Sequence, residues 1–595
     1  MLVMFLADTA RYVSGLTVAS PSDYTHVIIG GGVTGLIVAN RLTEDKHNNV
    51  LVIEAGRADD NAAIRMPYGA TYTLNQTLLW QNYVSEPEPG LNNLTWNTRV
   101  AHVLGGGSVI NGMAYDRGSA ADYDAWEALG NKGWGWAGMY PFFKKGTKFV
   151  APTQETVDKY GITWNPDVYG DGPLKVGFSD FQFPDVKDYF AAYAGAGTHM
   201  AHDGNNGESY GASWYPETFD PAKGERTHAR NSYYDPVSSR SNLHVLLETI
   251  ATELVFDNGR KLTARGVKIS DKTGITKTVY ASKEVILAAG AVNTAKLLQL
   301  SGIGPKSVLE AAGIKVKLAH DGVGANFQDH PYGSMSFTIS NMSVPNPNSW
   351  SDPAFNASAW EEYTTNKTGP LTQARGNSIA FIPLPQVAPE TFNDLATQVR
   401  NQANDAYLPA LYKNSTKLLK GVQAQREVLA GLFQNPKAGI VEYPIPGSGA
   451  FVMVSIQKPL SRGTITLNPT NPQGPPRIVY STLTNPIDKS VMAACVRYIR
   501  TLWARPELEK FSPVETSPGT QYTSDEELIN KMIDLKSFVP SLSHPTGSCA
   551  MMPEEQGGCL SIVDASIVPL VPSQHIQSTM YAVGEKAAYI IKNRR

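Results

Sequence analysis

The sequence has few cysteines, little net charge and no long apolar run, and each shortage excludes a class of protein. Its three cysteines, Cys495, Cys549 and Cys559, cannot form a disulfide framework and lack the spacing of a zinc site. One disulfide bond stays possible, with one thiol left over. Lys and Arg number 51 against 54 Asp and Glu, so the balance offers nucleic acid no basic surface. No run reaches the roughly 18 apolar residues of a membrane span.

The composition is that of a large folded protein. Hydrophobic residues make up 42% of the 595-residue chain, which excludes wholesale disorder. Charged residues are 18%, against roughly 25% in an average soluble protein. The length alone suggests about four domains, and nothing repeats at the spacing of a solenoid or propeller.

The N-terminus and the N-glycosylation sequons bear on the cellular compartment of the protein. Residues 1–7 are apolar, but Asp8 and Arg11 interrupt the run, and Ala19-Ser20 could close a signal-peptide cleavage site. We expect the secretory pathway or secretion, with the cytoplasm as the alternative. Sequons for N-glycosylation, which would suit a secreted glycoprotein, begin at Asn75, Asn93, Asn341, Asn356, Asn366 and Asn414.

A dinucleotide-binding pattern opens the chain. Residues 25–30 (THVIIG) predict a short buried strand, and residues 30–35 (GGGVTG) fit the motif G-x-G-x-x-G. A helix is expected over 33–42 and a second strand over 50–53, which ends on Glu54. Strand, glycines, helix, strand and acid therefore follow in the order of a Rossmann fold.

Each part of the pattern has a physical role. Gly30 makes the tight turn, Gly32 lets the backbone approach a pyrophosphate, and Gly35 lets helix and strand pack closely. Free N–H groups at the helix start hold the phosphates. Glu54, 19 residues after Gly35, would accept the ribose hydroxyls and disfavours a 2′-phosphate. The residues alone therefore indicate FAD or NAD rather than NADP.

Further segments extend this domain, and a stretch of different composition separates them. Residues 105–108 (GGGS) predict a loop whose backbone lies against a flat or anionic ligand. Residues 284–300 predict another strand–turn–helix, and residues 560–563 an apolar strand before Asp564. The Ser-, Asn- and Pro-rich residues 332–480, with strand-like pieces, predict an α+β substrate domain with an antiparallel sheet.

Two histidines near the C-terminus stand in notable contexts. His544 lies in a loop (SHPTGSC), and His575 precedes a final helix expected over 580–592. Two imidazoles converging on a hydroxyl could share the work, one taking the proton and the other holding the oxygen. By itself, each histidine is better explained as structural. We interpret His102, His320 and His330 as structural.

The motifs together resemble the glucose–methanol–choline (GMC) family of flavin oxidoreductases, from about Tyr24 to the C-terminus. The match is closest to fungal members with a histidine pair, such as patulin synthase-like enzymes and aryl-alcohol oxidases. It rests on GGGVTG with Glu54, RVAHVLGGGSVINGMAYDRG (99–118), GAVNTAKLLQLSGIGP (290–305), GVGANFQDHP (322–331), PLSRGTITL (459–467), SHPTGSCAM (543–551) and VDASIVPLVPSQHIQSTMYAVGEKAA (563–588).

The resemblance implies an architecture and a cofactor. An α/β FAD-binding Rossmann-like domain would be interwoven with the α+β substrate domain. It would divide the chain into a leader (1–23), an FAD-binding part (24–331), a substrate-binding part (332–540) and a C-terminal return to the FAD domain (541–595). Val109 stands where some members attach FAD through a histidine, so the FAD would be non-covalent. The implied FAD contacts are Gly30, Gly32, Val33, Thr34, Gly35, Glu54, Ala55, Ser108, Asn111, Gly112, Met113, Ala114, Ala251, Asp564, Ala565 and Ile576.

The resemblance also implies a reaction. His544 would be the catalytic base and His575 its partner in oxidising a primary alcohol, aryl or from secondary metabolism, to an aldehyde or lactone. O2 would accept the electrons and leave as H2O2. A dehydrogenase that passes electrons to a quinone, and a non-redox or inactive member of the fold, are the alternatives.

The sequence departs from the family pattern just before the last strand. A strand-and-turn segment that is usual there is absent, so residues 557–559 (GGC) run directly into Leu560. Losing this strand would expose a sheet edge or shift the register. The departure bears on activity more than on the fold. A milder one is Ala295, where proline or serine is usual.

Overall fold

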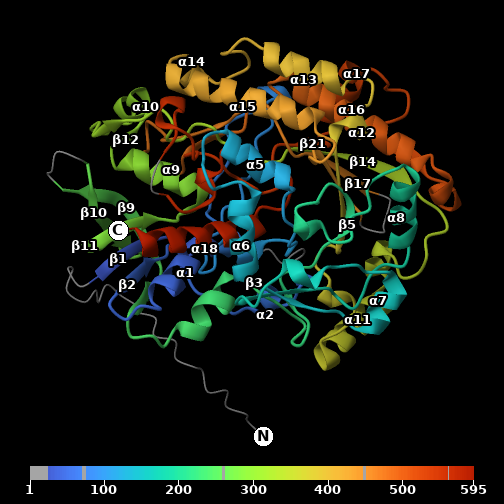
Figure 1. Ribbon diagram of the computed structural model, residues 1–595, viewed down its shortest axis with the longest axis horizontal. Helices are drawn as coiled ribbons and strands as arrows, with labels where there is room; N and C mark the ends of the chain where they lie inside the picture. The colour runs from blue at the N-terminus through green and yellow to red at the C-terminus, as the bar shows by residue number, and fades with distance from the viewer. Residues whose placement is uncertain (1–23, 70–75, 258–261, 446–450, 560–561, 595) are drawn as a thin grey trace, which may run out of the picture.

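The computed structural model describes residues 24–69, 76–257, 262–445, 451–559 and 562–594 (Figure 1). The expected leader, the sequon at Asn75 and the first half of the strand expected over 560–563 lie outside the described residues. Within them, no helix combines the length and the apolar character that crossing a membrane requires.

A six-stranded mixed sheet forms the first layer, in the order β8-β2-β1-β11-β10-β9. β8, β2, β1 and the end of β11 run parallel, while β10 and β9 are antiparallel extensions. The parallel strands are buried on both faces, as their unbroken apolar runs require. The bounds are β1 Tyr24–Ile29, β2 Val50–Ile53, β8 Leu243–Leu246, β9 Thr249–Phe256, β10 Ala264–Asp271 and β11 Thr276–Leu287.

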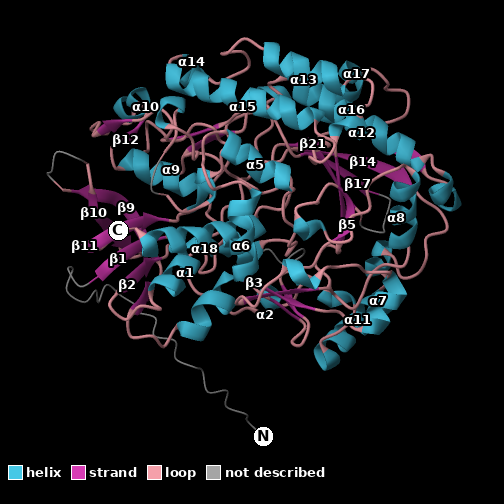
Figure 2. Ribbon diagram, in the orientation of Figure 1, coloured by secondary structure: helices cyan, strands magenta, loops and turns pink. Residues whose placement is uncertain are grey.

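Helices from both ends of the chain and from its middle pack on this sheet. α1 (Val33–Leu42) lies beside α18 (Gln577–Asn593) at the left of Figure 2, and α9 (Gly290–Leu300) follows β11. Arg41 of α1 pairs with the buried carboxylate of Glu585 in α18 at 2.6 Å. The C-terminal helix thus completes the fold that the first strand begins.

A second, antiparallel sheet forms the other layer, in the order β20-β14-β17-β16-β15-β5, with β21 also paired to β14. The helices α13, α15 and α16 lie along its upper side in Figure 1. The strands are β5 Gly211–Trp214, β14 Tyr332–Thr338, β15 Ser378–Ile382, β16 Val441–Pro444, β17 Phe451–Ile456, β20 Val514–Ser517 and β21 Phe538–Val539. The helices are α13 Phe392–Asn401, α15 Thr416–Gln434 and α16 Pro486–Trp503.

The remaining helices and strands surround the two sheets. The helices are α2 Ala62–Arg65, α4 Gly107–Ile110, α5 Ala120–Ala128, α6 Trp136–Gly146, α7 Gln154–Tyr160, α8 Val186–Gly195, α10 Lys306–Ala311, α11 Pro353–Asn366, α12 Leu384–Val387, α14 Ala410–Lys413 and α17 Asp525–Asp534. The strands are β3 Thr147–Val150, β4 Leu174–Gly177, β6 Phe219–Asp220, β7 Glu225–Arg226, β12 Ile303–Gly304, β13 Leu318–Ala319, β18 Thr464–Thr466 and β19 Arg477–Val479.

The fold class expected from the sequence is confirmed: a Rossmann-like α/β unit interwoven with an α+β unit that holds an antiparallel sheet. The interweaving goes further than expected, because β5 lies early in the chain and joins the second sheet. Where one domain ends and the next begins stays a prediction.

Two local details differ from the sequence expectation. Gly107 opens the one-turn helix α4, so only Gly105 and Gly106, both with positive φ, form the expected turn. Before Asp564, Ile562 makes a single parallel bridge with Leu287 at the end of β11. A disulfide bond between Cys549 and Cys559 lies beside this segment, and Cys495 is a buried free thiol.

Candidate active site

A cavity of about 880 Å³ opens at the carboxyl ends of the parallel strands and continues to the second sheet. This edge is where doubly wound sheets bind ligands, and the volume lies near the upper end for ligand sites. Of the predicted site residues, Gly35 alone is not at its wall. The wall includes Gly30, Gly32, Val33, Thr34, Glu54, Ala55, Ser108, Asn111, Gly112, Met113, Ala114, Ala251, Asp564, Ala565, Ile576, His544 and His575.

The glycines at the first turn divide into two kinds. A side chain at Gly30, whose φ is +108°, would collide with the backbone of Ala288, and one at Gly35 would collide with the carbonyl of Gly30. A side chain at Gly32 or Gly107 would meet no protein atom nearer than 3.9 Å. Gly30 and Gly35 therefore let strand and helix approach, whereas Gly32 and Gly107 leave backbone bordering the open cavity. This cradle suits a pyrophosphate at the start of α1.

Glu54 follows β2 and is held rigidly at the cavity wall. Its Oε2 accepts the backbone N–H of Gly31 at 2.7 Å, and its Oε1 accepts that of Gly56 at 2.7 Å. Burial raises the pKa of this carboxyl to about 7, in opposition to the two hydrogen bonds. Each oxygen keeps a lone pair with which it can accept a ribose hydroxyl.

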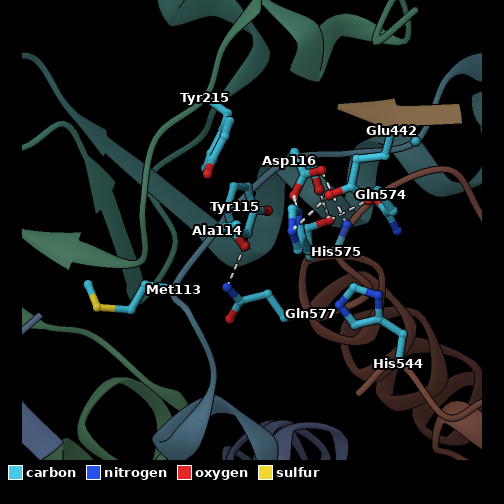
Figure 3. A network of polar contacts seen from close by, with 12 residues as sticks. Met113, Ala114, Tyr115, Asp116, Tyr215, Glu442, His544, Gln574, His575 and Gln577 are labelled. Carbon is cyan, nitrogen blue, oxygen red and sulfur yellow. Dashed lines mark hydrogen bonds and ion pairs between the residues drawn. The ribbon is translucent and has the colours of Figure 1, made fainter. Parts of the chain in front are cut away.

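The segment 111–114 crosses the cavity in a constrained conformation. Met113 has a φ of +68°, and its N–H donates to Asn111 Oδ1 at 3.0 Å. Arg226 donates to the same oxygen at 2.8 Å, and the Asn111 amide donates to Gln577 Oε1 at 2.8 Å. Gln577 in turn donates to the Ala114 carbonyl (Figure 3). The C-terminal helix thereby fixes the strip of backbone predicted to lie along a flavin.

The two histidines predicted as a pair do meet at this cavity. The ring centroids of His544 and His575 lie 5.4 Å apart with the rings at 89° (Figure 3). His544 comes from the loop after β21, and its backbone N–H donates to the buried carboxylate of Asp329 at 3.0 Å. His575 comes from the loop that leads into α18. Their joint position agrees with the sequence interpretation, while their catalytic roles stay predictions.

Two carboxylates flank His575. Asp116 Oδ1 lies 3.0 Å from His575 Nδ1, and Asp116 Oδ2 accepts the His575 backbone N–H at 3.2 Å. On the other side of the ring, Glu442 Oε1 lies 3.6 Å from Nε2 (Figure 3). The ring therefore has a hydrogen-bond acceptor at Nδ1 and a carboxylate at ion-pair distance from Nε2, a geometry that suits an imidazolium.

The pKa values of the two imidazoles are shifted in opposite directions. Burial opposes protonation of His575, but Asp116 and Glu442 outweigh it and raise the pKa of this imidazole to about 9. Burial and the neighbouring charge of His575 hold the pKa of His544 well below its ordinary value. Near neutral pH, one ring is a cation and the other a neutral base.

Aromatic side chains also line the cavity. The rings of Tyr68 and Trp350 are in tilted contact, with centroids 4.1 Å apart and planes at 33°, and the Tyr215 ring centroid lies 6.2 Å from that of His575. Phe183, Tyr332 and Phe451 also belong to this wall.

The structure adds site residues that the sequence interpretation missed. Asp116 lies within the quoted segment 99–118, and Asp329 and His330 lie within 322–331, so both motifs were available as signals. His330, interpreted as structural, has its ring against that of His544. Glu442 gave no signal, because a lone acid in a strand has no distinctive spacing.

Comparisons with known proteins concern the family and the fold of this chain. The model of the GMC oxidoreductase family matches residues 24–332 and 459–584. Dehydrogenase xptC of Emericella nidulans is 34% identical and aligns over 96% of this chain and 93% of its own. An FAD-dependent oxidoreductase from Chaetomium thermophilum, solved with a bound fragment, superposes with a TM-score of 0.91 at 36% identity, covering 96% of this chain and 99% of that one.

A fungal aryl-alcohol oxidase is also similar, with a TM-score of 0.89 and 33% identity over 96% of this chain and 98% of its own. Family model, sequence relatives and solved structures therefore agree over nearly the whole length. The chain belongs to the GMC oxidoreductase family.

Proposed function

We propose that this protein oxidises a primary alcohol with bound FAD. The observation that carries the proposal is the different protonation of two perpendicular histidines on one cavity wall, one neutral and one cationic. A neutral ring can take the hydroxyl proton, and a cationic ring can hold the oxygen by donating a hydrogen bond. FAD, when bound, supplies the hydride acceptor and the redox chemistry.

The cavity residues divide the tasks as follows. Gly32, Gly107 and the start of α1 would hold the pyrophosphate, and Glu54 the ribose. His544 would remove the proton from the alcohol, while His575 would hold the alcohol oxygen by donating a hydrogen bond. The binding is non-covalent in this proposal, because the buried side chain of Val109 offers no nucleophile. FAD should then appear in the supernatant after acid precipitation.

The substrate class is an aryl or secondary-metabolite alcohol, which leaves as an aldehyde or, from a hemiacetal, as a lactone. The aromatic wall formed by Tyr68, Tyr215 and Trp350 supports this assignment, since flat rings stack on such side chains. The likeness to an aryl-alcohol oxidase points the same way. O2 is the proposed acceptor, because the His575 cation would stabilise the developing negative charge as O2 is reduced.

The test is anaerobic flavin reduction with benzylic, polyketide-derived and sugar alcohols, followed by admission of air. Bleaching by an alcohol of the first two classes, and stoichiometric H2O2 after air, is the expected result. Reoxidation by a quinone but not by O2 would assign the dehydrogenase reaction instead. Failure of every alcohol to bleach the flavin would contradict the proposal.

We also propose the secretory pathway as the compartment. The disulfide bond is of a kind that persists in oxidising compartments. Four sequon asparagines, Asn93, Asn341, Asn366 and Asn414, are exposed, as glycosylation requires. A loss of apparent mass on glycosidase treatment of the native protein is expected, and an unchanged mass would contradict glycosylation.

A further inference from the structure

A third histidine stands behind the proposed base. Nδ1 of His330 lies 2.9 Å from Nδ1 of His544, with the rings at 87°. The His330 side chain is wholly buried. Resting on the function proposed above, we propose that His330 is a positioning residue: it accepts the Nδ1–H of His544 and thereby leaves His544 Nε2 unprotonated and free to take the alcohol proton.

The inference follows from counting protons. Two ring nitrogens at 2.9 Å share one hydrogen bond, which needs a donor on one ring and a bare nitrogen on the other. A neutral imidazole carries one N–H, so the bond decides the tautomer of both rings. Because Nδ1 of His544 is engaged with His330, Nε2 is the nitrogen left for the cavity. Only a His544 that donates through Nδ1 presents a bare Nε2 there.

Hydrogen bonds to one buried carboxylate fix the relative position of the two rings. A single carboxylate, Asp329, accepts the backbone N–H of His330 at 2.8 Å and that of His544 at 3.0 Å. The other Asp329 oxygen accepts the Ser541 hydroxyl at 2.7 Å. The backbones of both histidines are therefore held by the one buried carboxylate of Asp329, which fixes the distance between their rings.

The surroundings keep His330 a neutral acceptor. Burial, then the charges of Lys458 and His575 and that of His544 when it is protonated, lower its pKa well below the ordinary value. The backbone of Pro572 acts in the other direction and favours a proton on the His330 ring. This agrees with an N–H on Nε2 of His330, whose hydrogen-bond geometry to a partner is poor. A carboxylate in this position would raise the pKa of His544, whereas a neutral ring orients it without doing so.

The direct experiment is 15N NMR of the wild-type holoenzyme labelled at histidine, with the His544 signals assigned by their loss in His544→Ala. A protonated Nδ1 and a bare Nε2 on His544 are expected. A protonated Nε2 in the resting enzyme would overturn the inference. This measurement does not depend on turnover, so a failure of the proposed function is recognised separately, as a flavin that no alcohol reduces.

A pair of variants adds a kinetic readout. His330→Gln keeps a carbonyl acceptor for His544 Nδ1, whereas His330→Leu removes it. We expect the rate of anaerobic flavin reduction to fall about 10²- to 10⁴-fold in the Leu variant, as when an orienting partner is lost, with substantial rescue by Gln. His26→Leu, which removes another buried imidazole in the first half of β1, serves as the control. Equal rates in the Leu and Gln variants, with equal FAD content, would contradict the assignment.

Discussion

Asp116 and His575 lie 459 residues apart in the chain, and a hydrogen bond of 3.0 Å joins their side chains. The bond ties the strip that follows the second glycine loop to the loop before the C-terminal helix. With Glu442 on the far side of the ring, it makes His575 a permanent cation near neutral pH. This charge pattern leads to the first prediction.

Asp116→Asn should move the alkaline limit of activity to lower pH. In the wild type, the protonated form of His575 is lost as the pH rises through about 9, so activity should fall there. A charge-assisted hydrogen bond is worth about 1.5–3 kcal/mol, so its loss should shift the limb down by about one to two pH units. The measurement is kcat/KM against pH, with the exposed Asp171→Asn as the control. An unshifted limb would mean that Asp116 does not set the charge of His575.

His544→Ala should stop alcohol oxidation while leaving FAD bound. Removal of a general base costs about 10²- to 10⁴-fold, and the wall that faces the cofactor is otherwise unchanged. Stopped-flow reduction of the flavin without O2 measures this rate, and the absorbance ratio of flavin to protein gives the FAD content. His47→Ala, at a histidine whose side chain is 94% exposed, is the matched control. Wild-type turnover in the variant would remove His544 from the mechanism.

Two glycines of the first turn should respond differently to alanine. Gly32→Ala fits the protein but fills the space next to the proposed pyrophosphate, so FAD should bind at least about tenfold more weakly, or about 1.4 kcal/mol, with little change in apoprotein stability. Gly35→Ala collides with the Gly30 carbonyl and should lower the stability of the apoprotein itself.

Denaturant unfolding of the apoproteins and FAD titration separate these two effects. Gly431→Ala in α15 is the control, because the added methyl meets nothing within 4 Å and should stabilise the helix by about 1 kcal/mol or less. If Gly32→Ala bound FAD as the wild type does, the cofactor could not lie where we place it.

The disulfide bond should contribute to stability through a short loop. Its two cysteines are 10 residues apart, which predicts about 2–3 kcal/mol from chain entropy. The double variant Cys549→Ala with Cys559→Ala should unfold at correspondingly lower denaturant concentration. A reductant should destabilise the wild type and leave the double variant unaffected. Equal stability of wild type and variant without reductant would show that the bond adds nothing.

Local patterns predicted the elements near the first turn with accuracy. The helix expected over 33–42 and the strand expected over 50–53 match α1 and β2 in full, because glycines, apolar periodicity and a closing acid lie within one short stretch. At the start of α16, the Asn485 side chain caps the helix and Pro486 follows at its first position. Such signals depend on neighbours in the sequence.

Contacts between distant segments were not accessible in the same way. The sequence indicated two catalytic histidines, but nothing near Asp116, Glu442 or His330 shows that these residues surround them. Likewise, the place of β5 in the second sheet depends on its pairing with β15, more than 160 residues later. The residues of the site are thus assembled by topology, and a single sequence carries little information about such pairings.

The pairing of α1 with α18 also means that α1 must wait for its partner during synthesis. Arg41 and Glu585 are separated by 544 residues, so at about 5–20 residues per second the ribosome needs roughly half a minute to two minutes to supply the partner. During that interval the apolar side chains that α1 later buries against α18 have no cover from their own chain. The nascent protein should therefore depend on chaperones for nearly the whole of its translation. Loss of α18 alone should leave the apolar face of α1 exposed.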